Sequence, residues 1–244
     1  MATVPAKLVE AINGSLFAGP GYFYIDNNNN LISEGYDEGG RLGNGKVDGV
    51  WNNYFEKQTI LTNARYVTSS TVNSLAITYD NELYLWGSNF NKIVANDDTP
   101  NFATPQKVLD DVVFGALSDS AVFVVRSDGS LISWGYGGNG QLGDSAVVRN
   151  RTIDNAYKIM DDVKEVYAST YGAVGAVKTD KSLWMWGRNY YGELGNGVYT
   201  GGVSVEHDDI IKGYTPSKIL DNVEKIDIST NTIALKTDGT VWVW

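Results

Sequence analysis

Few side chains in this sequence could do chemistry. The chain has one histidine, His207, and no cysteine, so a histidine cluster, a disulfide and a thiol nucleophile are excluded. Residues 206–209 (Glu-His-Asp-Asp) form the one acidic cluster that does not recur, and they lack the glycine and ligand spacing of a dedicated calcium loop. We therefore expect no catalytic residue, no metal and no cofactor, with His207 in a solvated loop.

Paired carboxylates are the other candidates for acid–base chemistry. They occur at Asp110-Asp111 and Asp161-Asp162, with Asp221-Asn222 at the corresponding place further on. A feature present in every copy of a repeat is usually structural, and aspartate side chains readily accept hydrogen bonds from nearby backbone amides in turns. These pairs predict turns rather than a catalytic dyad.

The elements that must position these residues recur along the chain. The strongest copy is DKSLWMWG at 180–187, followed by GELGNG at 192–197. The glycine that closes each copy stands at 35, 87, 135 and 187. The related segments are DNNNNLISEG (26–35) with GRLGNG (40–45), DNELYLWG (80–87), DGSLISWG (128–135) with GQLG (140–143), and DGTVWVW (238–244). A period near fifty residues is typical of propellers and other repeat arrays.

Each copy contains four short apolar segments, which predict four antiparallel strands and one propeller blade. An example is 163–168, 173–177, 183–186 and 215–219, with a tight hairpin at the Asp after the second segment. We expect an all-β propeller of five units in one domain, 1–244, with units of about 5–35, 36–87, 88–135, 136–187 and 188–244. Residues 4–8 resemble a fourth strand, so we expect the N-terminal strand to close the last blade; the alternative is a fragment of a larger propeller.

The third segment of each copy is apolar at consecutive positions, which predicts burial on both faces between neighbouring sheets. Its repeated tryptophans are Trp86, Trp134, Trp186 and Trp244. We expect them in the core between blades rather than in an aromatic cage for sugars.

Composition sets limits on partners and location. The hydrophobic content of 43% is enough for a packed core, and the formal net charge is -10. An acidic chain repels phosphate backbones, so a nucleic-acid partner is disfavoured. The longest apolar run is too short for a transmembrane helix, and residues 1–5 do not have the features of a signal peptide.

The repeated segments DGSLISWG with GQLG, DKSLWMWG with GELGNG, and DGTVWVW resemble the repeats of the regulator of chromosome condensation family in a bacterial-type form. The resemblance implies a propeller fold, and its founding members are nucleotide exchange factors that bind chromatin. Here Gly19, Asn73, Ala121, Ala173 and Asn231 stand where the family's second strand opens with histidine, and residues 92–94 replace one Gly-x-Leu-Gly turn. The resemblance to secreted or surface relatives that bind a protein fits better, and it favours an extracellular or cell-surface location in a bacterium over the cytoplasm.

The variable insertions lie between the third and fourth strands, at 46–57, 88–103, 144–155 and 198–214. A four-stranded meander brings these connections to the same side as the turns between strands one and two. The insertions are rich in aromatic residues, which are enriched at binding hot spots. The candidate partner-binding residues are Trp51, Tyr54, Phe90, Tyr190, Tyr191, Tyr199 and His207.

We therefore predict a non-enzymatic protein-binding module, and its acidic charge favours a basic partner. The alternatives are a lectin-like propeller that stacks sugars on the loop aromatics, a guanine nucleotide exchange factor, and a glycoside hydrolase with two carboxylates around one pocket.

Overall fold

The computed structural model describes residues 7–12, 21–37, 39–47, 54–145, 150–198 and 213–244. The chain divides into two compact units, Met1–Val113 and Phe114–Trp244, and each is described by itself. The regular structure of the described residues consists of twenty β-strands and one short 3-10 turn, η1 (Ile153–Asn155). The predicted all-β class is confirmed.

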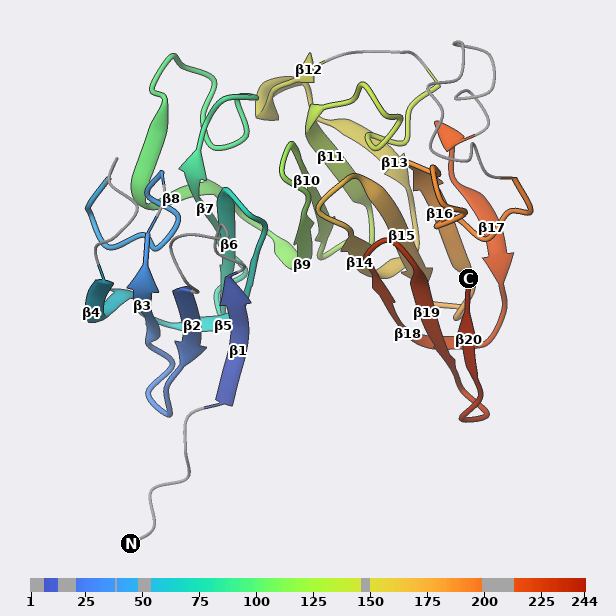
Figure 1. Ribbon diagram of the computed structural model, residues 1–244, viewed down its shortest axis with the longest axis horizontal. Helices are drawn as coiled ribbons and strands as arrows, with labels where there is room; N and C mark the ends of the chain where they lie inside the picture. The colour runs from blue at the N-terminus through green and yellow to red at the C-terminus, as the bar shows by residue number, and fades with distance from the viewer. Residues whose placement is uncertain (1–6, 13–20, 38, 48–53, 146–149, 199–212) are drawn as a thin grey trace, which may run out of the picture. The chain divides into compact units, whose positions relative to one another are not determined.

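The first unit contains two antiparallel sheets with their strands in chain order (Figure 1). The first sheet consists of β1 (Lys7–Ile12), β2 (Gly21–Ile25), β3 (Leu31–Tyr36) and β4 (Tyr54–Leu61). The second sheet consists of β5 (Ala64–Ser69), β6 (Asn73–Thr78), β7 (Leu83–Ser88) and β8 (Asn101–Leu109). Both are the four-stranded meanders that the repeat predicts.

The remaining three sheets continue the same pattern. The third sheet consists of β9 (Val112–Leu117), β10 (Ala121–Arg126), β11 (Leu131–Tyr136), β12 (Asn150–Arg151) and β13 (Tyr157–Met160). Its last two strands, β12 and β13, both pair with β11. The fourth contains β14 (Val163–Ala168), β15 (Ala173–Lys178), β16 (Leu183–Gly187) and β17 (Ser217–Leu220). The fifth contains β18 (Val223–Ile228), β19 (Thr232–Lys236) and β20 (Val241–Val243). The number of antiparallel sheets among the described residues, five, equals the predicted number of repeat units.

The expected role of the N-terminal strand needs a correction. Lys7 pairs with Ile25 and Leu8 pairs with Tyr24, so both residues belong to β1, the first strand of the first sheet. They were expected to act as part of a fourth strand of the last blade, but among the described residues the last sheet consists of β18–β20 and does not include them. Residues 4–6 of the expected closing strand lie outside the described part of the chain.

The hairpin between the second and third strands uses the chemistry that the sequence predicts. The Asp180 carboxylate accepts hydrogen bonds from the Ser182 amide (2.9 Å) and hydroxyl (2.6 Å), and Asp128 and Asp238 do the same with Ser130 and Thr240. The next residue has positive φ in each of these three hairpins: Gly129 82°, Lys181 65° and Gly239 85°. A left-handed residue at this position matches the hairpin to the twist of its strands.

The carboxylate pairs are turn residues, as predicted. Asp111, Asp162 and Asn222 all have φ of 61–62° in the two-residue link between consecutive sheets. The preceding aspartates Asp110, Asp161 and Asp221 form ion pairs of 2.7–2.9 Å with Lys107, Lys158 and Lys218, three residues earlier on the fourth strand. Each link is therefore fixed by contacts within itself and the preceding strand.

The repeated tryptophans join neighbouring sheets within each unit. Trp86, Trp134 and Trp186 are fully buried, which confirms the core role predicted for them. The indole nitrogens of Trp86 and Trp186 donate to the carbonyls of Arg41 (2.6 Å) and Gln141 (2.8 Å) in the Gly-x-Leu-Gly turn of the preceding sheet. Gly43 and Gly143, which close these turns, lie against the same indoles, where a Cβ would come within about 3 Å of the ring nitrogen.

The last described strand departs from the expected burial. Third strands were expected to be buried on both faces, and β11 and β16 are largely buried. Every residue of β20 is exposed, and Trp244 is only partly buried. Within the described part of the second unit no further sheet packs on the outer face of β18–β20, which explains the difference.

Candidate functional site

Within each unit, the first–second turns lie beside the chain that leaves the third strand. The Ser88 amide donates to Val72 O (3.1 Å) in the first unit, and the amides of Tyr136 and Arg188 donate to Ser120 O (2.7 Å) and Gly172 O (3.0 Å) in the second. As predicted, the turn between the first and second strands and the connection that follows the third strand therefore lie next to each other, at the same end of each of these sheets.

A cluster of three tyrosines around one cation forms at this end of the fourth sheet. The Arg188 guanidinium carbon lies 4.6 Å from the Tyr190 ring centroid, 4.9 Å from Tyr171 and 5.3 Å from Tyr191. We call these four residues the Arg188 cluster. Tyr171 is 57% exposed and Tyr191 is 61% exposed, so two rings that are held by the arginine also face solvent. Such ring–guanidinium contacts are stabilising and keep aromatic side chains in fixed orientations.

A buried carboxylate orients the arginine. Arg188 Nη1 lies 3.6 Å from Glu193 Oε1, and the Glu193 side chain is fully buried. The other carboxylate oxygen, Oε2, accepts a 2.8 Å hydrogen bond from the Tyr191 amide. The Arg188 side chain is only 12% exposed, so the cluster presents tyrosine rings rather than a bare cation to a partner.

A pocket lies next to the cluster. It has a volume of about 340 Å³ and is lined by Tyr191, Gly192, Gly195, Gly197, Val198 and Trp244. Tyr191 belongs to both features, with Arg188 beside its ring. Two aromatic side chains with glycines between them give a slot for an apolar side chain, and the groups available for hydrogen bonding come mainly from the backbone.

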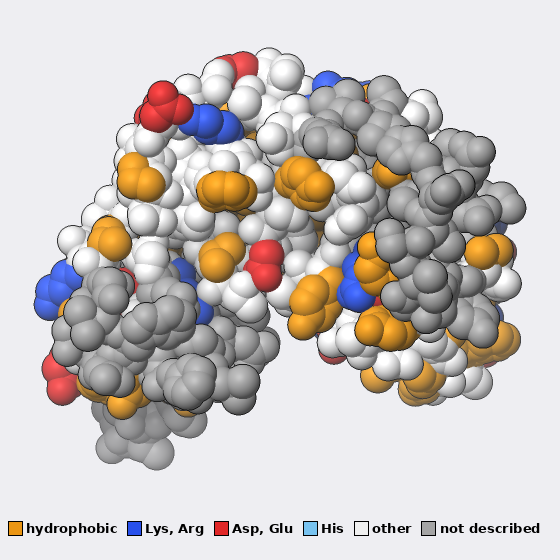
Figure 2. Space-filling model, turned by 45° about the horizontal axis from the view of Figure 1, so that its top comes forward, with side chains coloured by type: hydrophobic (Ala, Val, Ile, Leu, Met, Phe, Trp, Pro, Cys, Tyr) orange, Lys and Arg blue, Asp and Glu red, His pale blue; other side chains and the backbone are white. Residues whose placement is uncertain are grey.

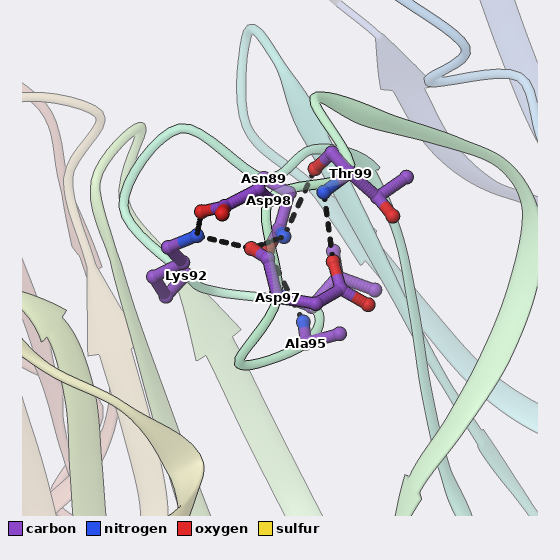
Figure 3. Close-up of polar contacts among 7 residues, drawn as sticks. Asn89, Lys92, Ala95, Asp97, Asp98 and Thr99 are labelled. Carbon is purple, nitrogen blue, oxygen red and sulfur yellow. Dashed lines mark hydrogen bonds and ion pairs between the residues drawn. The ribbon is translucent and has the colours of Figure 1, made fainter.

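The β7–β8 connection of the first unit is held by a dense set of polar contacts (Figure 3). Asn89 accepts hydrogen bonds from the amides of Val94 (3.0 Å) and Ala95 (3.1 Å) and donates to the carbonyls of Asp97 (3.3 Å) and Thr99 (3.1 Å). Residues 92–94 replace the Gly-x-Leu-Gly turn here, and Lys92 takes the left-handed conformation (φ 55°). In two copies that keep the Gly-x-Leu-Gly turn, Asp37 and Asn189 accept the same hydrogen bond from the amides of Leu42 and Leu194. The turn at residues 92–94 therefore keeps this hydrogen bond although its glycines are missing.

The loop residues of the first unit differ in how available they are. Phe90, which follows Asn89 in the sequence, is 88% exposed, and Tyr54 at the start of β4 is 51% exposed and packs edge-on against Tyr36. The nearby Glu34 carboxylate is the largest cause that raises the pKa of Tyr54. Phe55 and Phe102 instead pack against the core of their unit.

The acidic residues of this loop are partly neutralised. Lys92 forms a 2.6 Å ion pair with Asp98, and this hydrogen bond is the main cause that lowers the pKa of the Asp98 carboxyl. Asp97 accepts a hydrogen bond from the Thr99 amide (2.9 Å). In the view of Figure 2, hydrophobic side chains stand singly or in small groups among polar ones rather than in one continuous patch.

The structure thus brings together two of the predicted partner-binding residues, Tyr190 and Tyr191, and leaves Tyr54 and Phe90 exposed in the other unit. Trp51, Tyr199 and His207 lie outside the described residues. Sequence reasoning missed Arg188, Tyr171 and Glu193. Arg188 directly follows the closing Gly187 of the repeat, and Tyr171 lies in a first–second turn, so their positions in the repeat were the available signal.

No group of three or more histidine, cysteine, aspartate or glutamate side chains that could hold a metal occurs among the described residues, and residues 206–209 lie outside them. A search of the same residues finds no helix with the length and hydropathy needed to cross a membrane.

Comparison with known proteins is consistent with the fold. No family model matches the chain. The chain is 30% identical over 130 residues to the mitochondrial RCC1 domain-containing protein RUG3 of Arabidopsis thaliana, a match covering 50% of this chain and 28% of RUG3. It is 25% identical over 233 residues to the Arabidopsis ultraviolet-B receptor UVR8, covering 91% of this chain and 50% of UVR8. Yeast RCC1 (Prp20), solved in complex with Kap60, matches with a TM-score of 0.74 and 20% identity over 91% of this chain and 53% of that chain.

The fold and the aromatic loop ends define a repeat-built β-propeller. Its repeats are similar to those of the regulator of chromosome condensation family, the resemblance that the sequence predicted. RUG3, UVR8 and Prp20 are eukaryotic proteins, and the chain spans about half of their length or less. The bacterial form and the surface location therefore stay predictions.

Proposed function

We propose that the chain is a non-enzymatic module that binds another protein through the loop ends of its blades. The observation that supports this most is the Arg188 cluster, in which tyrosine rings are both exposed and held in place. Tyrosine and arginine are enriched at binding hot spots because they offer large contact areas at a small cost in conformational entropy.

The properties of relatives point the same way. Yeast RCC1 (Prp20) has been solved with Kap60 bound, and Prp20p from Saccharomyces cerevisiae has described binding to Gsp1p and histones. For this chain we propose only the general role, which is to bind a partner protein at the loop ends. The formal net charge of -10 favours a basic partner through electrostatic steering.

A sugar-binding role has less support. The rings of Tyr190 and Tyr191 lie within about 5 Å of the Arg188 guanidinium, so part of each ring is already covered. The pocket beside Tyr191 is lined by glycines, a valine and a tryptophan, and few side chains there could bond sugar hydroxyls.

Quantitative affinity capture from the native source tests the proposal with three baits. These are the unmodified chain, the double variant Tyr171→Ala/Tyr191→Ala, and Tyr79→Ala as a matched control, because Tyr79 is also 57% exposed but lies next to a hairpin at the other end of its sheet. We expect a partner captured by the unmodified chain and by the control to be depleted about tenfold or more with the double variant, the effect of losing one hot-spot side chain. Equal capture by all three baits would contradict the proposal.

A further inference from the structure

We propose that the face of the first sheet that carries Glu34 binds the guanidinium group of an arginine side chain in a partner protein. Tyr22 on β2, Glu34 and Tyr36 on β3, and Tyr54 on β4 form this site, and we call them the Glu34 site. It lies in the first unit and does not depend on the Arg188 cluster, so either binding role can fail without the other.

The register of three neighbouring strands brings these four side chains together (Figure 1). Tyr22 pairs with Glu34 between β2 and β3, and Tyr36 pairs with Tyr54 between β3 and β4. Because side chains two residues apart on a strand point to the same face, Glu34 and Tyr36 share one face with their partners. The opposite face carries Phe23, which is fully buried in the core of the unit, so the four side chains point away from that core.

Glu34 stands where other copies of the repeat carry tryptophan, directly before the closing glycine. Trp86 and Trp186 occupy this position in the second and fourth sheets, and each donates its indole N–H to a carbonyl of the preceding sheet. An ionised carboxylate has no hydrogen to donate, so Glu34 cannot make this contact with any turn. The identity of residue 34 therefore makes this face different from the corresponding faces, and it favours a ligand that donates hydrogen bonds.

The groups on this face attract a cation. Tyr36 and Tyr54 pack edge-on with ring centroids 5.6 Å apart, and Tyr54 is 51% exposed. The Glu34 carboxylate, then burial, the Glu56 carboxylate and the hydroxyls of Tyr22 and Tyr36 raise the pKa of Tyr54, so these groups lie near one another. None of these causes is a lysine or an arginine. Among the side chains that the structure describes, Glu34 forms no ion pair.

The Arg188 cluster shows a similar set of groups with a cation in place. There the guanidinium carbon lies 4.6–5.3 Å from three tyrosine ring centroids, and a glutamate oxygen lies 3.6 Å from one guanidinium nitrogen. The Glu34 site offers three tyrosines and a glutamate without the arginine. A guanidinium is planar, carries five N–H donors and stacks on aromatic rings, so an arginine of the partner supplies the missing group. The formal net charge of -10 steers a basic segment towards the chain.

The probe is N-acetylarginine amide, titrated into the full chain with isotope-labelled tyrosine rings and followed by NMR. We expect saturable shifts of the Tyr22, Tyr36 and Tyr54 ring signals, with a dissociation constant on the order of 1 mM. The tyrosine-to-phenylalanine variant at each position assigns its signal. N-acetylcitrulline amide has nearly the same shape without the charge and should cause no saturable shift. N-acetyllysine amide should bind at least about threefold more weakly, because an ammonium lacks the planar fork of donors.

A pair of variants tests the carboxylate. Glu34→Gln keeps the size of the side chain and removes its charge, so it should weaken binding about tenfold, the effect of one lost charge-assisted hydrogen bond. Glu224→Gln is the matched control, because it makes the same change of charge at a partly exposed carboxylate of the second unit, and its affinity should stay within about twofold. Circular dichroism of both variants establishes that they are equally folded.

Three outcomes would overturn the proposal. The first is the absence of saturable shifts at the three ring signals up to about 20 mM probe, including the case in which only Tyr171, Tyr190 and Tyr191 respond. The second is equal affinity of the Glu34→Gln and Glu224→Gln variants. The third is binding of the lysine derivative as tightly as the arginine derivative.

Discussion

Single buried tryptophans connect neighbouring sheets, and their hydrogen bonds can be tested one at a time. Trp186→Phe keeps an aromatic ring but leaves the buried Gln141 carbonyl without its 2.8 Å indole donor. We expect the free energy of unfolding to fall by about 1–3 kcal/mol, the cost of an unsatisfied buried acceptor, as measured by urea denaturation. The control is Trp184→Phe, because Trp184 is partly exposed and donates to Ser182 of its own hairpin. Equal losses in both variants would contradict the connecting role.

The hairpin aspartates predict a pH dependence. Hydrogen bonds from Ser130, Ser182 and Thr240 are the main causes that lower the pKa values of Asp128, Asp180 and Asp238 below the ordinary 3.8. Because the folded pKa is the lower one, their contribution to stability is complete above pH 3.8 and is lost as the pH falls through the lowered values. The melting temperature should therefore decrease as the pH falls below 3.8, and it should decrease less in the triple variant with asparagine at these positions. A triple variant with an unchanged pH profile would show that the three hairpins contribute nothing.

Among the connections between strands, the β7–β8 loop shows how an altered turn is kept in place. Asn89 fixes this loop by accepting two backbone hydrogen bonds and donating two (Figure 3). We expect Asn89→Ala to lower the free energy of unfolding by about 1–3 kcal/mol, because the amide of the buried Val94 loses its acceptor. Asn89→Asp keeps the acceptor, as Asp37 does in the first sheet, and should cost less. The control Phe90→Ala changes a side chain that is 88% exposed, so urea denaturation should detect almost no change.

The strands could be predicted from the sequence because each one recurs with the same apolar pattern and the same hairpin chemistry. The predicted 163–168 and 223–228 coincide with β14 and β18. The loops could be predicted only in part, since their lengths and residues differ between copies. Placement on a loop was enough to select Tyr190 and Tyr191. It could not select Arg188 and Tyr171, because their contact joins two different connections and depends on how the sheet brings those connections together.

At the scale of the molecule, the outer face of the fifth sheet sets the behaviour of the whole chain in solution. Ile233, Leu235, Val241 and Val243 are 46%, 38%, 61% and 62% exposed, whereas Val177, Leu183 and Met185, which take three of the corresponding places in the fourth sheet, are at most 1% exposed. An exposed apolar face of this kind promotes association. We therefore expect the chain to enhance the fluorescence of the dye ANS and to self-associate as its concentration rises.

The double variant Val241→Thr/Val243→Thr tests this expectation without changing the backbone conformation of β20, because threonine suits a strand and has nearly the shape of valine. ANS fluorescence should fall by about half or more, and sedimentation velocity should show less association at the same concentration. Phe90→Ser removes one isolated exposed aromatic ring and should change neither measurement. If the two variants behaved alike, the apolar face of β18–β20 would not be the source of association.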